Sequence, residues 1–261
     1  MVAPPAVVEQ SVVSSISTVK SVHIILILMI VSHKHRYIFI KTRKTAGTSV
    51  EIALSVNCGP NDIITLKVDE KIKSNLRYKA AQNYKINRKG IIDHLMGLLG
   101  FDKFYYPHIP AYKIRKIIGE EIFSNYHKFC VVRNPWDRVV STYFWRLKNS
   151  DYFNLDVETT FTDFIDQSSS EILSDKHLFT VDGKSMVDTV IRYENLDSEL
   201  NNALSKLGLP KAELPNAKSG TRASKAHYST YYDDKSLEKI NQICAWEIDK
   251  FGYTFEDLRN Q

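Results

Sequence analysis

The chain has 261 residues, of which 43% are hydrophobic and 25% charged, and its formal net charge is +5. This composition is typical of a soluble globular protein, and the length is sufficient for one large α/β domain. The mild positive charge fits an anionic ligand. The lack of an arginine-rich arm or a recognisable nucleic-acid-binding module argues against nucleic acid as a partner.

Residues 1–28 differ in composition from the rest, and we predict that they form an N-terminal extension to a domain of residues 29–261. They run into the apolar segment 24–31, which is shorter than the ~20 residues that a membrane helix needs. A buried first strand, a weak membrane anchor and a sequence upstream of a start at Met29 are the alternative interpretations. Three widely spaced cysteines without metal-ligand spacing favour a reducing compartment, so a cytoplasmic location is favoured over membrane association.

The next segment combines a predicted strand with a turn of small residues. Residues 37–40 are aromatic and β-branched, as in a buried strand, and an apolar helical pattern starts at Val50. Between them lie Lys44 and the small or hydroxylated residues 45–49. Free backbone N–H groups at a helix start bind anions, and the helix dipole favours negative charge there. The pattern predicts an anion-binding turn with Lys44 at its mouth; an ordinary strand–helix turn with an unrelated lysine is the alternative.

This turn does not have the spacing of a nucleoside-triphosphatase P-loop. That motif places its lysine directly after the second of two glycines and follows it with a hydroxyl for magnesium. Here Lys44 precedes Gly47, and the turn contains no other glycine. The segment can therefore hold a phosphate, but it lacks the arrangement that binds a magnesium-bound triphosphate.

Residues 57–106 give few indications of structure. Their basic residues predict either a solvated surface, which is the commoner case, or a groove for an acidic acceptor. After them, Pro110 and an apolar stripe predict a helix that stops at Gly119. His108 lies just before this helix, between two prolines, in a stiff loop of the kind that often presents a functional histidine. A surface histidine or a hydrogen-bonded structural one is the alternative.

A second strand–turn–helix pattern follows. Residues 129–132 predict a buried strand, and Arg133 stands at its C-terminal end, where ligands bind in open α/β sheets. Pro135 suits the start of the next helix, and Ser141 lies about two turns into it. An arginine fork and a serine hydroxyl are suitable donors to a phosphate. The alternative is that Arg133 pairs with a nearby carboxylate and Ser141 packs inside the protein.

The two segments together resemble the donor-binding motifs of sulfotransferases. Lys44-Thr-Ala-Gly-Thr-Ser resembles the loop that binds the 5′-phosphosulfate, and Val132-Arg-Asn-Pro-Trp-Asp-Arg-Val-Val-Ser141 resembles the motif that binds the 3′-phosphate. The order of the motifs, the strand before each and the arginine–serine spacing all match. The similarity extends from about residue 30 to the C-terminus. It is closest to the carbohydrate-type, sulfotransferase family 2-like branch that includes bacterial members.

The resemblance implies an α/β fold, a P-loop-like three-layer sandwich with a central, mainly parallel sheet flanked by helices. It implies 3′-phosphoadenosine 5′-phosphosulfate (PAPS) as the donor, no metal ion, and an acceptor hydroxyl that we expect on a carbohydrate. Lys44 would contact the bridging oxygen of the phosphosulfate, and His108 would be the catalytic base. The expected donor-binding residues are Arg43, Lys44, Thr45, Ala46, Gly47, Thr48, Ser49, Arg133, Ser141, Tyr193, Arg222 and Lys225.

The C-terminal half adds a third predicted strand, residues 187–191, which delivers Tyr193. The resemblance places this tyrosine against the adenine; core packing at the strand end is the alternative. A polar segment contains Arg222 and Lys225, and in the family a basic loop at this point closes over the donor. One amphipathic helix is predicted over residues 234–250.

Two other functions stay open from the sequence. A nucleotide kinase or other phosphotransferase would need carboxylates placed to hold magnesium, and no predicted strand clearly ends in such an aspartate. A non-catalytic nucleotide-binding module would hold the nucleotide without transferring a group. His177 is a second candidate base, and no segment indicates the oligomeric state.

Overall fold

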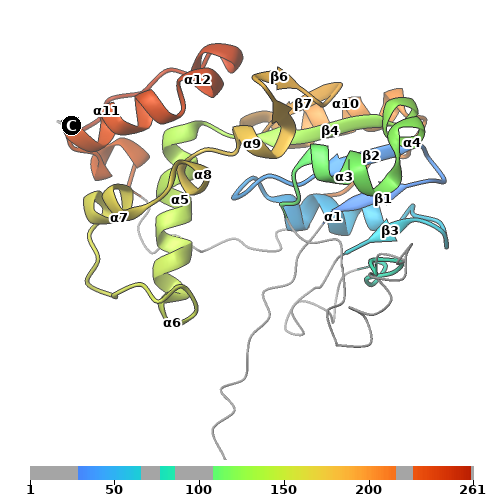
Figure 1. Ribbon diagram of the computed structural model, residues 1–261, viewed down its shortest axis with the longest axis horizontal. Helices are drawn as coiled ribbons and strands as arrows, with labels where there is room; N and C mark the ends of the chain where they lie inside the picture. Colours follow the sequence, from blue (N-terminus) through green and yellow to red (C-terminus); the bar gives the residue numbers. More distant parts are fainter. Residues whose placement is uncertain (1–28, 66–76, 86–107, 216–225, 260–261) are drawn as a thin grey trace, which may run out of the picture.

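The computed structural model describes residues 29–65, 77–85, 108–215 and 226–259. Their centre is a five-stranded sheet in the order β3-β1-β2-β4-β7 (Figure 1). The strands in this order are β3 (Ile63–Ile64), β1 (Ile30–Ser32), β2 (Tyr37–Ile40), β4 (His127–Val132) and β7 (Thr189–Arg192). The N-terminal extension predicted for residues 1–28 lies outside the described residues.

The sheet is mixed, whereas the sequence predicted a mainly parallel one. Strands β2, β4 and β7 are parallel, but β1 is antiparallel to both β2 and β3. The reason is the short connection between β1 and β2, which is long enough only for a hairpin, because a parallel pair needs a crossover of a dozen or more residues. The helical crossovers that make strands parallel begin only after β2.

Helices cover both faces of the sheet, so the expected three-layer order is present. On one face, Phe39 and Phe129 pack against α1 (Gly47–Ser55) and α10 (Leu196–Lys206). On the other face, Ile38 and Cys130 pack against the helices α3, α4, α9 and α12. These are α3 (Ala111–Ile118), α4 (Glu120–Asn125), α9 (Lys176–Phe179) and α12 (Ala245–Phe251). Burial on both faces explains why residues 37–40 and 129–132 are continuously apolar rather than alternating.

A separate group of helices lies beside the sheet and has its own hydrophobic core (Figure 1). Its longest member, α5, begins at Pro135, where Asn134 caps it by accepting a hydrogen bond from the backbone N–H of Asp137. The members are α5 (Pro135–Lys148), α7 (Phe161–Gln167), α8 (Ser170–Leu173), η3 (Tyr228–Tyr231) and α11 (Asp234–Ile243), and α6 (Ser150–Phe153) follows α5 without adding a buried residue. Because α5 starts at the C-terminal end of β4, it connects this helical group directly to the sheet edge where ligands are expected.

The structure corrects three predicted element boundaries. The helix predicted over 234–250 is two helices, because the backbone leaves the helical conformation at Cys244, where φ is −97° and ψ is 11°. The strand predicted over 187–191 is β7, which starts two residues later and lies at the edge of the sheet. The first helix begins at Gly47 rather than Val50.

The remaining elements are short. A hairpin of β5 (Thr180–Val181) and β6 (Lys184–Ser185) follows α9, and the 3₁₀ turn η2 (Tyr193–Asn195) follows β7. Among the helices of the described residues, none is both long enough and apolar enough to cross a membrane.

Candidate active site

The turn between β2 and α1 has the backbone geometry of an anion-binding site. Lys44 and Ala46 both have left-handed φ values, 59° and 56°, which turn successive N–H groups toward one side. Ala46 is the N-cap of α1 and makes no side-chain cap hydrogen bond. The first N–H groups of the helix, those of residues 47–49, have no acceptor within the helix. They are therefore donors that an anion bound at the helix start can use, and the anion site itself stays a prediction.

Lys41 lies directly beneath this turn and explains the glycine at position 47. A Cβ atom on Gly47 would lie 2.6 Å from Cε of Lys41, so a larger residue would collide with the lysine side chain. The Lys41 ammonium donates to Oε2 of Glu51 at 2.9 Å and to Oγ1 of Thr48 at 3.3 Å. Both ends of the ion pair are buried, with 8% and 0% of the side chains exposed. Lys41 therefore ties β2 to the first turns of α1.

Arg133 joins the two motifs that the sequence singled out. Its Nη1 donates to the backbone carbonyl of Lys44 at 2.7 Å, and its Nε and Nη2 donate to Oδ2 of Asp137 at 2.9 and 2.6 Å. Its guanidinium also lies 4.3 Å from the ring centroid of Tyr193. The carboxylate partner that the sequence left as an alternative is thus present. The predicted residues Lys44, Arg133 and Tyr193 come together at the C-terminal ends of β2, β4 and β7.

Ser141 lies two turns into α5 and is partly exposed. Trp145 follows one turn later, and the Lys44 ammonium lies 5.4 Å from the centroid of its ring. Residues four apart lie on the same helix face. Ser141 and Trp145 therefore mark the side of α5 that faces the anion-binding turn.

His108 lies beside the same turn, just before α3. Its Nδ1 is 3.0 Å from the carbonyl oxygen of Lys41, and since a carbonyl only accepts, Nδ1 carries the proton and Nε2 keeps its lone pair. Burial, followed by the positive charges of Lys41 and Arg43, lowers the pKa of His108 to about 3, while Asp175 acts in the opposite direction. The ring is therefore neutral, with an acceptor nitrogen, over the ordinary pH range.

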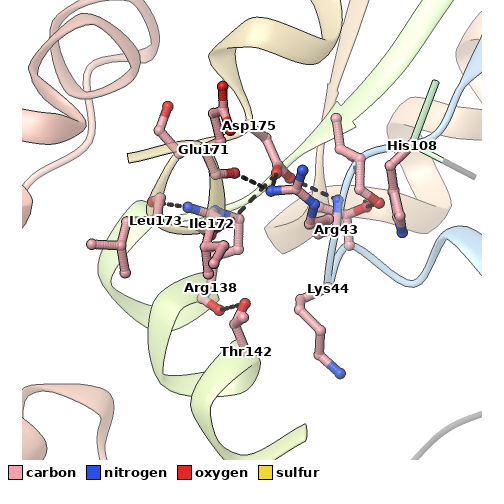
Figure 2. A network of polar contacts seen from close by, with 12 residues as sticks. Arg43, Lys44, His108, Arg138, Thr142, Glu171, Ile172, Leu173 and Asp175 are labelled. Atoms are coloured by element: carbon pink, nitrogen blue, oxygen red, sulfur yellow. Dashed lines mark hydrogen bonds and ion pairs between the residues drawn. The ribbon is translucent and has the colours of Figure 1, made fainter. Parts of the chain in front are cut away.

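A buried network around Asp175 holds the backbone next to Lys44 (Figure 2). Oδ2 of Asp175 accepts a hydrogen bond of 2.7 Å from the backbone N–H of Arg43. Oδ1 lies 3.3 Å from Nη1 of Arg43 and 3.7 Å from Nη1 of Arg138. Burial by itself would raise the pKa of Asp175, but the two arginines outweigh it and hold the pKa below its ordinary value. Asp175 is therefore an ionised carboxylate shared by two guanidinium groups.

The Arg43 side chain does not point into the anion-binding turn. Its guanidinium hydrogen-bonds the carbonyl of Glu171 and lies 3.2 Å from Nε2 of His177. Figure 2 shows the Lys44 side chain pointing away from this network. The side chain and the backbone N–H of Arg43 are therefore both bonded within the protein, and the hydroxyl of Thr45 is likewise internal, bonded to Thr42.

Sequence reasoning missed the charged residues beneath the turn. Arg138 lies inside the second motif and Lys41 directly follows the strand predicted at residues 37–40, so each was an unassigned charge close to a predicted strand. Glu51 lies two residues beyond the predicted turn and was likewise an unassigned charge, whereas Asp175 had no such indication, because it becomes a neighbour of the turn only through folding. Arg222 and Lys225 lie outside the described residues. Within the described part of the chain, no group of histidine, cysteine, aspartate and glutamate side chains is arranged to hold a metal ion.

Comparison with known proteins identifies the family. A model of the sulfotransferase family matches residues 28–254, so this chain belongs to the sulfotransferase family. An uncharacterised protein of Archaeoglobus fulgidus is 33% identical over 109 residues, which are 40% of this chain and 85% of the archaeal protein. No solved structure matches the chain significantly. The predicted sulfotransferase family 2-like membership is confirmed.

Proposed function

We propose that this protein transfers the sulfuryl group of PAPS to a hydroxyl group of a carbohydrate. The observation that supports this best is the 2.7 Å hydrogen bond from Arg133 to the Lys44 carbonyl, which joins the anion-binding turn to the end of β4. A donor phosphorylated at both the 5′ and the 3′ position of one ribose needs two phosphate sites side by side. Membership of the sulfotransferase family supports sulfuryl transfer as the reaction.

The proposed step is a single in-line displacement. The acceptor oxygen forms a bond to sulfur while the bond between sulfur and the bridging oxygen of the 5′-phosphate breaks. The electron pair of that bond leaves with adenosine 3′,5′-bisphosphate. Lys44 and the outward N–H groups of residues 47–49 stabilise the charge that develops on the leaving phosphate. Arg133 and Ser141 bind the 3′-phosphate, and Tyr193 lies against the adenine.

The acceptor proton goes to Nε2 of His108, which is the nitrogen left unprotonated by the hydrogen bond to the Lys41 carbonyl. With a pKa of about 3, His108 is a weak base before the donor binds. The donor brings several negative charges to the turn, and nearby negative charge favours the imidazolium and raises a histidine pKa. Donor binding would thus prepare the base for the transfer.

Nucleotide binding is the first test. Adenosine 3′,5′-bisphosphate at about 100 times its dissociation constant should stabilise the fold by about 2.7 kcal/mol. For a protein of this size that is a shift in Tm of roughly 5–10 °C. ATP with magnesium should give a much smaller shift. A larger shift with ATP would favour the phosphotransferase alternative and refute the proposal.

Group transfer is the second test. Sulfur-labelled PAPS is incubated with a panel of oligosaccharides and simple alcohols in the presence of a chelator, and we expect label in at least one oligosaccharide. Lys44→Ala should lower the turnover about 10²- to 10³-fold, the usual effect of removing one donor to a developing anion. Tight nucleotide binding without transfer to any acceptor would instead favour the non-catalytic binding module.

A further inference from the structure

Two buried carboxylate oxygens near the anion-binding turn accept no hydrogen bond from the described residues. They are Oδ1 of Asp175 and Oε2 of Glu247. Asp175 is 4% exposed and Glu247 is 6% exposed, so bulk water does not replace the missing donors. A buried acceptor without a partner is costly, and such atoms are rare in folded proteins. Each of the two oxygens therefore needs a partner that is not a side chain or backbone group already described.

Asp175 and Glu247 line the same small cavity, which lies at the C-terminal end of β4. Its other polar lining residues include Thr42, Arg133 and Arg138. The cavity offers about 10 Å³ to the centre of a water molecule, which is close to the minimum for holding one. A single proton shared between the two carboxyl groups, with or without one water molecule, gives both oxygens a partner.

The neighbours of the two carboxyl groups indicate which one carries this proton. Oδ1 of Asp175 lies 3.3 Å from Nη1 of Arg43 and 3.7 Å from Nη1 of Arg138, and these positive charges favour the ionised form (Figure 2). Oε1 of Glu247 accepts only from neutral donors, the Ser174 hydroxyl at 2.7 Å and the Asp175 N–H at 3.2 Å. Burial raises the pKa of Glu247 above its ordinary value, although Arg138 and the Ser174 hydrogen bond oppose this. The proton therefore belongs to Glu247.

We propose that Glu247 is a positioning residue of the candidate active site. As a neutral acid it donates a hydrogen bond to Oδ1 of Asp175, directly or through one water molecule, while its Oε1 accepts from the Asp175 N–H. Oδ2 of Asp175 in turn accepts from the backbone N–H of Arg43, the neighbour of Lys44. Glu247 on α12 thereby holds the carboxylate that fixes the anion-binding turn. Its effect on catalysis rests on the proposed function, whereas its protonation does not.

Infrared difference spectroscopy tests the protonation directly. The wild type is compared with Glu247→Gln at pH 6, where an ordinary glutamate with a pKa of about 4.3 is almost fully ionised. We expect the wild type to show the C=O stretching band of a neutral carboxylic acid, and Glu247→Gln to lack it. Glu238→Gln, which removes an exposed carboxylate from α11, should keep the band. A wild-type spectrum without a band that depends on Glu247 would overturn the proposal.

The pH dependence of stability gives an independent test with a defined sign. Above about pH 4.3 the unfolded chain releases a proton that the neutral acid keeps in the folded protein, so the wild type should lose stability relative to Glu247→Gln as the pH rises. His108, Cys244, Arg138 and Asp175 surround the carboxyl pair and are present in both proteins, so the comparison isolates Glu247. No difference between the two curves, or a wild type that gains stability relative to Glu247→Gln, would contradict a neutral Glu247.

Kinetics separate positioning from a purely structural role. Glu247→Gln keeps one donor and one acceptor and should retain most of the turnover with saturating PAPS. Glu247→Leu removes both and should lower the turnover about tenfold, more than it lowers the affinity for adenosine 3′,5′-bisphosphate. If Glu247→Leu does not fold, Glu247→Asp, whose acid is drawn back from Asp175, should show the same split. Unchanged turnover in the folded variant refutes the positioning role. Failure of the wild type to bind the nucleotide would refute the proposed function and leave the infrared result standing.

Discussion

The buried ion pair of Lys41 and Glu51 allows a quantitative test of how the anion-binding turn is held. The two side chains are 8% and 0% exposed, and their charged atoms are 2.9 Å apart. Removing one partner of such a pair leaves an uncompensated buried charge, which costs about 3–5 kcal/mol. Lys41→Met and Glu51→Leu should therefore each lower Tm by about 10 °C or more. The double variant replaces both charges by apolar groups and should lie within about 2 kcal/mol of the wild type.

The assay is equilibrium unfolding in urea, followed by circular dichroism, for the wild type, both single variants and the double variant. The expected coupling energy is about 3 kcal/mol or more. The exposed pair Lys235 and Asp166, 72% and 39% exposed with a separation of 2.6 Å, is the matched control and should couple by less than about 1 kcal/mol. If the effects of Lys41→Met and Glu51→Leu simply add, the pair does not hold the turn and the reasoning is wrong.

Three further predictions concern the residues around the turn. Arg133→Ala should lower the affinity for adenosine 3′,5′-bisphosphate, measured by calorimetry. It should also lower the turnover with saturating PAPS, measured by steady-state kinetics, because Arg133 holds the Lys44 carbonyl. A loss of affinity with unchanged turnover would contradict this expectation. The pKa of His108 is about 3 in the folded protein and about 6.5 in the unfolded chain, so below pH 6.5 the unfolded chain binds a proton that the folded protein does not. The free energy of unfolding therefore falls as the pH decreases from 6.5 toward 3, by up to about 1.4 kcal/mol per pH unit from His108. Denaturation curves of His108→Gln between pH 7 and 5 should show a shallower decline than the wild type. Asp175→Asn removes the ion-pair partner of the buried Arg138 and should lower Tm more than Asp188→Asn, because the Asp188 side chain is 46% exposed.

The sequence predicted the elements whose indications are local. A continuous apolar strand followed by small residues predicted β2 and the turn, and Asn134-Pro135 predicted the start of α5, because capping and proline geometry act over a few residues. The mixed sheet was not predicted, because the antiparallel pairing of β1 with β2 follows from the short connection between the two strands, and the composition of β1 does not indicate it. The break falls at Cys244, whose thiol contacts Leu173, 71 residues away in the chain, and the apolar periodicity within 234–250 does not mark it.

The residues of the candidate site could likewise be predicted where their positions follow from local sequence patterns. Lys44, Arg133 and Tyr193 each stand at the end of a predicted parallel strand, and the carboxyl ends of parallel strands meet at one edge, so their convergence follows from local patterns and one rule of topology. Asp175 precedes a helix of four residues, and its partners come from α5 and from the turn after β2. Its role depends on three elements at once, and nothing in its neighbouring sequence distinguishes it from a surface aspartate.

The carboxylates of the site explain how so many cations can be held together before an anionic ligand arrives. Lys41 pairs with Glu51, Arg133 with Asp137, and Asp175 with both Arg43 and Arg138. Each carboxylate reduces the repulsion between neighbouring cations and fixes the direction of a side chain or of the backbone next to it. Under the proposed function, the same pairs reduce the affinity for the 3′-phosphate, because that phosphate competes with Asp137 for the N–H groups of Arg133. Under the proposed function, the site exchanges some affinity for a fixed geometry, which is what stabilisation of a transition state, rather than of a bound ground state, requires.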